Sequence, residues 1–519
     1  MTALDKVREE GMRASEKRCR KLFMGEVDFS PAILIAGRKM SLYKLVLRKK
    51  RGQRASSSKI RRLAHQVGVT KPLSVTVEEA EAAYTEALEE YHKTKVQSPV
   101  LRYSYLQARK DDPNASEESR RAVERLLNTE RAREFSRHLK RIKATPHLGA
   151  ISKVEVPSDD GSEPQVFETQ DTVEKAIMES IEKRYKLAHN SPFLQEPLKS
   201  VLGLTATNAA AEQILSGTFQ CPPGVDAFTR TMITMFKRPP DATGMVETTV
   251  SRDDYQWYWK RAREKTSSAY SGLHFGHWKA AAQCEELSEV HSLYTEIATS
   301  SGYVPPRWTH ALTVMLEKKP GVIAVDKLRA ITLLEGDFNF ANKLFLGVRM
   351  MKNADAKKWT VKEALGSRKN HDARELALNR RLMADISRQQ VRPLAVASLD
   401  AAQCYDSIAH PAGSLACQRL GAPPLFLSCM LLCIQLMKFH LRTAYGDSDS
   451  HFNSRPGENP LQGICQGNGG GPPFWYGVSV VLVIVLYHRG HGAKYRSALS
   501  NEITIAAGLL FVDDTDLLA

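Results

Sequence analysis

The sequence has no Cys-x-x-Cys pair of the kind that binds zinc. Its eight cysteines include no Cys-x-x-Cys motif, which argues against a structural zinc site and against a disulfide framework. Cys429 and Cys433 lie four residues apart in an apolar run, so we expect both thiols to be buried on one helix face. This cysteine usage fits a reducing compartment.

The sequence also lacks a secretion signal and a membrane-spanning run. The N-terminus opens with charged residues and has no apolar signal region. The longest apolar run, Phe474–Tyr487, has 14 residues, which is too short to span a bilayer. We therefore expect a buried core element at this run, no membrane partner, and an intracellular protein of the nucleus or cytoplasm.

Positive charge is concentrated near the N-terminus. The formal net charge is +15, and residues 1–62 hold 18 Lys or Arg against 6 Asp or Glu, which is a surplus of 12. The clusters Lys49–Arg54 and Arg61–Arg62 are typical of phosphate contacts or of a nuclear localisation signal. A solvated basic arm without a ligand is the alternative, and we favour nucleic-acid contact.

Capping and turn signals divide the chain into regions. Thr76 and Glu79 form a capping box before one helix, and Ser116 begins a second helix that Pro146 ends. An acidic, turn-rich stretch follows. We expect a basic, mostly helical region over 1–156, a linker over 157–170, a helical segment over 171–264 and a final domain over 265–519.

Three aspartates near the C-terminal end are the most informative residues. Asp513 and Asp514 lie between apolar runs, which predicts a β-hairpin with an acidic turn, and Asp400 ends another apolar strand. An Asp-Asp pair alone is common in turns. Carboxylates that lie close together repel one another unless cations neutralise their charge. Two magnesium ions about 3.5–4 Å apart stabilise the attacking and the leaving oxygen of an in-line phosphoryl displacement.

Further segments carry a family resemblance. They are Leu316–Gly321, Leu328–Leu334, Ser398–His410 and Leu461–Trp475. Their order and spacing resemble the reverse transcriptases of non-LTR (LINE-like) retrotransposons. That family has a Lys-Pro-Gly turn, Arg-Pro-Ile-Ser-Leu, Asp-x4-aromatic-Asp, Gln-Gly ahead of a Pro, and Asp-Asp after an aromatic. The resemblance covers about residues 265–519.

The resemblance implies a fold and a metal site. The fold would be α+β, with the fingers and an incomplete palm of a right-hand polymerase behind the helical basic region. Asp400, Asp513 and Asp514 would be catalytic and would hold two Mg²⁺ ions, or Mn²⁺ in their place. His410 and Asp516 are nearby polar residues. We expect a structural role for His410 and no metal contact for Asp516.

The resemblance also assigns the substrate contacts. Tyr405 would be the aromatic gate that excludes a ribose 2′-hydroxyl and selects dNTPs; the alternative is a core aromatic. Lys319 and Arg329 would hold the triphosphate. Gln466 and Gly467 would contact the incoming nucleotide and the template. A weaker match, to the segment that opens the fingers, falls at Lys265–Ser268 and Ser271–Gly272.

The sequence departs from the family at several positions. Gln403-Cys404 replaces the usual Lys-Ala, Ala330 replaces a proline, and Asn468–Gly471 replaces Pro-Leu-Ser. None of these changes removes a reactive group. Because the family continues into more palm, a primer grip and a thumb, the resemblance also implies a C-terminally truncated fragment.

The expected activity is RNA-directed DNA synthesis. The partners would be an RNA template, a DNA primer and dNTPs. A catalytically inactive relic that only binds nucleic acid is the alternative, and an RNA-dependent RNA polymerase is disfavoured by Tyr405. Oligomeric state, template specificity and the role of residues 1–156 stay open.

Overall fold

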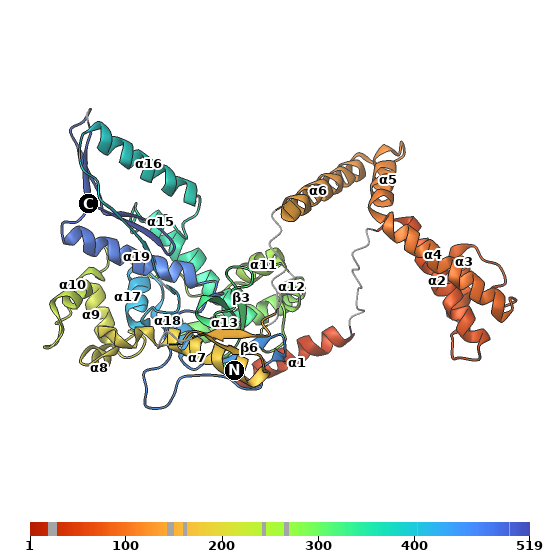
Figure 1. Ribbon diagram of the computed structural model, residues 1–519, viewed down its shortest axis with the longest axis horizontal. Coiled ribbons are helices and arrows are strands. Elements are labelled where there is room, and N and C mark those ends of the chain that lie inside the picture. Colours follow the sequence, from red (N-terminus) through yellow and green to blue (C-terminus); the bar gives the residue numbers. More distant parts are fainter. Residues whose placement is uncertain are drawn as a thin grey trace. The chain divides into compact units, whose positions relative to one another are not determined.

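The structure is a computed structural model of the 519-residue chain, and its secondary structure mixes helices with short strands (Figure 1). It describes residues 1–18, 29–142, 150–158, 163–240, 245–263, 269–401, 403–497 and 499–519. The chain forms two compact units. The larger contains Met1–Arg18 and Leu148–Ala519, and the smaller contains Cys19–His147.

The smaller unit is helical. Its elements are α2 (Pro31–Lys50), α3 (Ser57–Val67), α4 (Val77–Val96), α5 (Ser98–Asp111) and α6 (Glu117–Ile142). Leu42 and Val46 on α2 pack against Ile60 on α3 and Ala80 on α4. The capping box that begins α4 is confirmed. Ser116 caps α6 through the Ser119 N–H, and Pro146 lies outside the described residues.

The larger unit contains two main sheets. The first has the order β4-β3-β6-β7, with β3 (His310–Glu317) antiparallel to β4 (Leu328–Leu333) and parallel to β6 (Lys438–Thr443). The second has the order β10-β11-β5 and is antiparallel throughout. Its strands are β10 (Gly508–Phe511), β11 (Asp514–Leu518) and β5 (Val396–Asp400), and β7 of the first sheet is Gly446–Asp447.

Two small hairpins complete the strands. β1 (Val154–Val156) pairs with β2 (Gln165–Phe167), and β8 (Ala493–Arg496) pairs with β9 (Ile503–Ala506). Part of the stretch expected to be a linker over 157–170 is therefore paired as β2. Since β1 and β2 adjoin α7, this hairpin belongs to the larger unit.

Helices make up most of the rest of the larger unit. Before the first sheet come α1 (Thr2–Arg18), α7 (Gln170–Tyr185), α8 (Leu198–Leu202), α9 (Ala209–Ser216), α10 (Ala227–Met235), α11 (Arg252–Arg261), α12 (Phe275–Ala281) and α13 (Glu285–Ser301). Within and after it come α14 (Gly336–Asn342), the π-helix η5 (Lys343–Met350), α15 (Met351–Ala356), α16 (Ala373–Gln389), α17 (His410–Arg419), α18 (Pro424–Gln435) and α19 (Gly471–His488). Short 3₁₀ turns are η1 (Leu187–Asn190), η2 (Pro192–Leu194), η3 (Pro306–Thr309) and η4 (Val325–Lys327).

Helix α19 is the central apolar helix. It has the length and hydropathy of a membrane-crossing helix, but 56% of it is buried inside the structure. Phe474, Val480 and Val483 belong to the main core of the larger unit. The expectation of a buried core element is therefore confirmed, with a helix four residues longer than the 14-residue apolar run. Cys429 and Cys433 on α18 are buried thiols in the same core.

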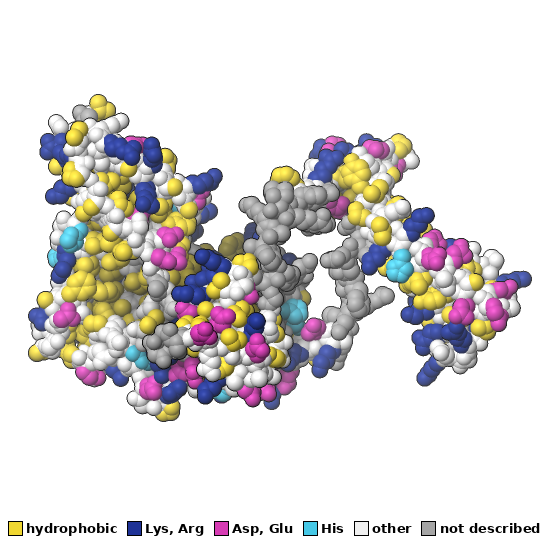
Figure 2. Space-filling view, in the orientation of Figure 1, with side chains coloured by type: hydrophobic (Ala, Val, Ile, Leu, Met, Phe, Trp, Pro, Cys, Tyr) yellow, Lys and Arg dark blue, Asp and Glu magenta, His cyan; other side chains and the backbone are white. Residues whose placement is uncertain are grey.

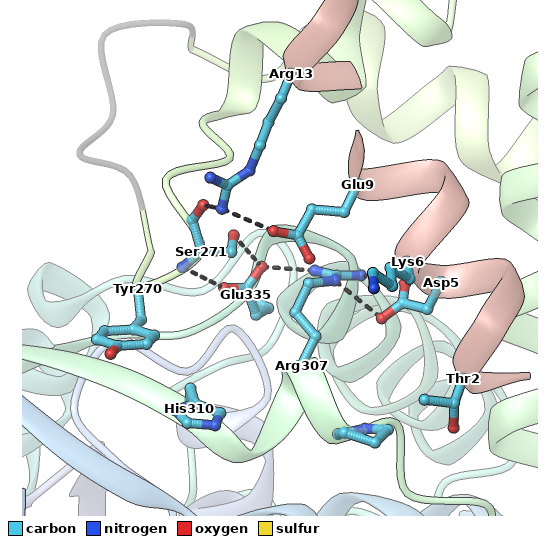
Figure 3. Close-up of a pocket in the computed structure, with 11 residues that line it drawn as sticks. Thr2, Asp5, Lys6, Glu9, Arg13, Tyr270, Ser271, Arg307, His310 and Glu335 are labelled. Atoms are coloured by element: carbon cyan, nitrogen blue, oxygen red, sulfur yellow. Dashed lines mark hydrogen bonds and ion pairs between the residues drawn. The ribbon is translucent and has the colours of Figure 1, made fainter. Parts of the chain in front are cut away.

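Helix α1 is part of the larger unit and does not belong with the basic region that follows it. Asp5 forms an ion pair of 3.0 Å with Arg307, and Arg8 approaches Asp337 at 3.5 Å. Arg307 also pairs with Asp337 at 2.5 Å and with Glu335 at 2.6 Å. Figure 3 shows Arg307 between Asp5 and Glu335, at the edge of a cavity of about 340 Å³.

This ion network is buried. Burial opposes the charge of Arg307, but Asp337 and Glu335 outweigh that effect and raise the pKa of the guanidinium further. Buried charges are tolerated when each one is paired and hydrogen-bonded. The network therefore fixes α1 to the rest of the larger unit, and the expected grouping of residues 1–18 with residues 19–156 is wrong.

Candidate functional site

The acidic hairpin and its neighbouring strand are present. β10 and β11 form an antiparallel hairpin whose turn is Val512-Asp513. In the pairing of β11 with β5, Asp514 lies directly opposite Asp400, and the Ala401 N–H donates to the Asp513 carbonyl at 3.4 Å. Opposed residues of an antiparallel pair share one face of the sheet. The hairpin and its meeting with the strand of Asp400 are confirmed.

The acidic turn is held in a strained conformation by its neighbours. Val512 has φ of 57°, a left-handed value that β-branched residues rarely adopt. The indole N–H of Trp475 donates to the Val512 carbonyl at 2.6 Å. A Cβ on Gly366 would lie 2.5 Å from the Val512 nitrogen, so glycine is what allows these two segments to approach so closely.

The three aspartates are open to a cation. Asp400 and Asp514 are exposed and Asp513 is half-buried, and no described Lys or Arg forms an ion pair with any of them. The carboxylate oxygens of the three aspartates do not all lie within 4.8 Å of one another. Among the described residues, only Glu16, His274 and His277 form a group of three possible ligands with that spacing. Like charges keep carboxylates apart. Their oxygens are the donors that Mg²⁺ prefers, so the residues fit the ion by chemistry.

Asp516 is already engaged by protein groups. Its carboxylate accepts a hydrogen bond from the Ser398 hydroxyl at 2.5 Å and pairs with Arg380 of α16 at 3.3 Å. Helix α16 thus lies across the acidic face, over a cavity of about 330 Å³ that Asp400, Asp514 and Asp516 line. Through these contacts Asp516 holds α16 against the sheet.

Tyr405 lies beside the glycine-rich loop and the acidic turn. Its carbonyl accepts the Ile464 N–H at 2.7 Å, and a Cβ on Gly471 would lie 3.7 Å from its ring. Burial raises the pKa of the Tyr405 phenol, and the charges of Cys404 and Asp513 raise it further. The half-buried ring is therefore within electrostatic range of Asp513.

The loop of Gln466 and Gly467 lies along strand β4. The Thr332 N–H donates to the Gln466 carbonyl at 2.6 Å, and the Asn339 amide donates to the Gly467 carbonyl at 3.2 Å. Gly467 has φ of 114°, and a Cβ there would lie 2.3 Å from the Thr332 carbonyl oxygen. Only glycine permits this approach without a shift of backbone.

The two expected phosphate-binding cations lie at the turn end of the β3–β4 hairpin. Arg329 is opposite Leu316, and Lys319 follows β3 by two residues. Both side chains are exposed, and neither forms an ion pair with a described residue. Arg329 is on strand β4, as is Thr332, whose N–H donates to the Gln466 carbonyl. Strand β4 therefore joins Arg329 to the loop that contacts Tyr405. Lys319 lies in the turn between β3 and β4.

His410 holds the segment that leads into the loop of Gln466 and Gly467. Its Nε2–H donates to the Gly463 carbonyl at 2.5 Å, and its Nδ1 accepts from the Gln435 amide at 2.9 Å. Burial lowers the pKa of His410 to about 4. The expectation of a structural role is confirmed.

Several supporting residues were assigned no role from the sequence, although Trp475 and Asn342 lie in or beside segments that carry the family resemblance. They are Trp475, Arg380, Asn339 and Asn342, the last of which bonds Asn468 at 3.1 Å. Each acts through a partner more than 30 residues away. Ser271, in the weaker family match, donates to Glu335 at 3.0 Å, and Lys265–Ser268 lie outside the described residues.

The group of Glu16, His274 and His277 does not suit a metal ion. Nδ1 of His274 accepts the Gly276 N–H at 3.1 Å, and Nδ1 of His277 accepts the His274 N–H at 3.2 Å. A neutral ring that accepts at Nδ1 carries its proton on Nε2, which faces Glu16 at 3.7 Å from His274 and 3.2 Å from His277. A metal needs a lone pair at that nitrogen, so the group is a set of polar contacts between α1 and α12.

Searches against protein-family models and against curated proteins found no match to this chain.

Proposed function

We propose that this chain is the RNA-directed DNA polymerase (reverse transcriptase) part of a retrotransposon. The larger unit would supply fingers and palm elements of a right-hand polymerase. The observation that carries the proposal is the register of β11 on β5, which sets Asp514 opposite Asp400 with Asp513 in the adjoining turn. The reaction joins a dNTP to a primer 3′-hydroxyl opposite a template base.

Asp400, Asp513 and Asp514 would hold two divalent ions. Bound magnesium would activate the primer hydroxyl and neutralise the charge of the leaving pyrophosphate. The residues themselves provide carboxylate oxygens, those of Asp513 on a turn that Trp475 fixes and those of Asp400 and Asp514 on the adjoining strands. A fixed turn lowers the reorganisation needed for catalysis.

The sugar and base would be positioned by Tyr405 and the loop of Gln466 and Gly467. Tyr405 lies between that loop and Asp513, a place where its ring would meet the 2′ position of a bound nucleotide. Gly467 brings loop backbone against β4. Arg329 on β4 and Lys319 in the hairpin turn are exposed cations without described ion-pair partners, which suits contacts to a triphosphate.

Template and primer would bind through basic surfaces. Figure 2 shows Lys and Arg side chains over α16, where Arg374, Arg381 and Arg388 are largely exposed. In the smaller unit Arg61 and Arg62 are exposed on α3. Contacts of this kind release counterions and make binding sensitive to salt.

A second candidate is an inactive relic that only binds nucleic acid. It is favoured by one observation, that the oxygens of the three aspartates do not converge within the 4.8 Å reached by Glu16, His274 and His277. In this case the basic surfaces would bind RNA or DNA without any dNTP requirement.

Primer extension tests the proposal. The full chain is incubated with poly(rA)·oligo(dT), Mg²⁺ and dTTP, beside Asp513→Asn and the matched control Asp449→Asn, an exposed aspartate outside the site. We expect extension by wild type and the control and none by Asp513→Asn. Equal extension by Asp513→Asn would refute the site. Salt-sensitive RNA binding without extension by any of the three would favour the relic.

A further inference from the structure

Arg419 is a buried cation for which the described residues provide no ion-pair partner. It is the last residue of α17 and is 9% exposed. Its Nε and Nη1 atoms are buried and have no hydrogen-bond partner in the structure. An arginine in this condition carries a desolvation cost that pairing would normally offset. Burial lowers the pKa of Arg419 to about 10, and no carboxylate acts against that shift.

A cavity adjoins this arginine. It has a volume of about 180 Å³. Its walls are Glu212, Arg238, Met245, Trp359, Gln418, Arg419 and Gly421. None of these residues belongs to the acidic site.

The acidic group of the cavity is already neutralised. Both oxygens of Glu212 accept hydrogen bonds from Arg238, at 2.5 and 3.0 Å. The Gln418 amide nitrogen donates to the Ala206 carbonyl and the Ser414 hydroxyl. The charge of Arg419 is therefore the uncompensated one among the residues that line this cavity.

We propose that this cavity binds a phosphate-type oxyanion through Arg419. A planar guanidinium matches the geometry of phosphate oxygens, and charge-assisted hydrogen bonds are the strong ones. Arg238 lines the same cavity, but its charge is already matched by Glu212, so the anion would depend on Arg419. The indole of Trp359 supplies an apolar wall, which lowers the local dielectric and strengthens the pairing. The site is independent of polymerase activity.

Phosphate titration of the full chain is the first test. Inorganic phosphate is added at constant ionic strength, and binding is followed by calorimetry and by the thermal unfolding midpoint. We expect saturable binding and a midpoint that rises with phosphate concentration. Arg419→Met should weaken binding at least about tenfold and should lose the phosphate-dependent rise.

The matched control is Arg489→Met. Arg489 is an exposed arginine immediately after the C-terminus of α19, so this variant should bind phosphate like wild type. No saturable binding by wild type, or equal binding by Arg419→Met, overturns the proposal. If Arg419→Met does not fold, Arg419→Lys keeps the charge; reduced affinity supports the site and unchanged affinity refutes it.

Competition identifies the source of the anion. A free phosphate and a phosphodiester of nucleic acid present the same oxygens. A short single-stranded oligonucleotide that displaces phosphate from wild type points to a nucleic-acid backbone, and the absence of displacement points to a free anion.

Discussion

Trp475 and Val512 join the central helix to the acidic turn. The indole of Trp475, near the start of α19, donates to the carbonyl of a residue that is itself in a left-handed conformation. The position of Asp513 therefore depends on a helix 37 residues away in sequence.

Trp475→Phe tests this dependence. The variant keeps an aromatic ring but loses the hydrogen bond, so we expect a loss of about 0.5–1.5 kcal/mol in the free energy of unfolding. We also expect weaker Mn²⁺ binding, because the turn would no longer be fixed. Denaturant unfolding and Mn²⁺ titration measure the two effects. Trp257→Phe, at an exposed indole, should change neither.

Gly467→Ala tests the approach of the loop to β4. The added Cβ would lie 2.3 Å from the Thr332 carbonyl oxygen, so we expect a loss of stability above the roughly 1 kcal/mol that a left-handed alanine alone costs. Gly457→Ala is the control, because Gly457 also has positive φ but has open space around it. Similar unfolding free energies for both variants would contradict the close approach.

Asp337→Asn tests the ion network that holds α1. The substitution removes a buried negative charge from between Arg307 and Arg8, and we expect a loss of about 3–5 kcal/mol. Asp385→Asn breaks partly exposed pairs with Arg381 and Arg388 and should cost at most about 1 kcal/mol. Denaturant unfolding compares the two, and equal losses would show that the network is not buried in solution.

His410 should make stability depend on pH. Its pKa is lowered from 6.5 to about 4, so the unfolded chain binds the proton more readily than the folded chain between these values. Stability therefore falls as pH drops from 6.5 to 4, by about 3 kcal/mol in total from this residue. His410→Gln should flatten that part of the curve. An unchanged pH dependence in the variant would show that His410 is not buried in the neutral form.

Tyr405→Ala tests the sugar gate. Removal of the ring should admit ribonucleotides, because the 2′-hydroxyl would no longer meet a bulky group. The ratio of UTP to dTTP incorporation on poly(rA)·oligo(dT) measures the change. If the selectivity is unchanged, Tyr405 only packs against the glycine-rich loop at Gly471 and does not select the sugar.

The acidic hairpin was predictable because its signals are local. Apolar runs on both sides of Asp513 and Asp514 specify strands, and the acidic residues between them specify a turn. The structure sets that turn at Val512-Asp513, and Asp514 already belongs to β11. The meeting with Asp400 followed from a second strand that ends in an acid. No local pattern reveals the bond from Trp475 to Val512 or the pair of Arg380 with Asp516.

The docking of α1 could not be predicted from charge. Asp5 and Arg8 were counted in a basic segment, where charges are normally solvated, yet both are buried against Arg307 and Asp337. Their partners lie about 300 residues along the chain. Composition averages over such residues and cannot separate a solvated charge from a paired one.

The docked helix has a topological consequence. Because α1 and residues 148–519 belong to one unit, residues 19–147 are an insertion in the sequence of that unit. A single proteolytic cut within the insertion would break the covalent link between α1 and residues 148–519. The ion pairs of Asp5 and Arg8 would still hold α1 in place. The two fragments should then purify together in low salt and behave as a split protein that reassembles from its halves.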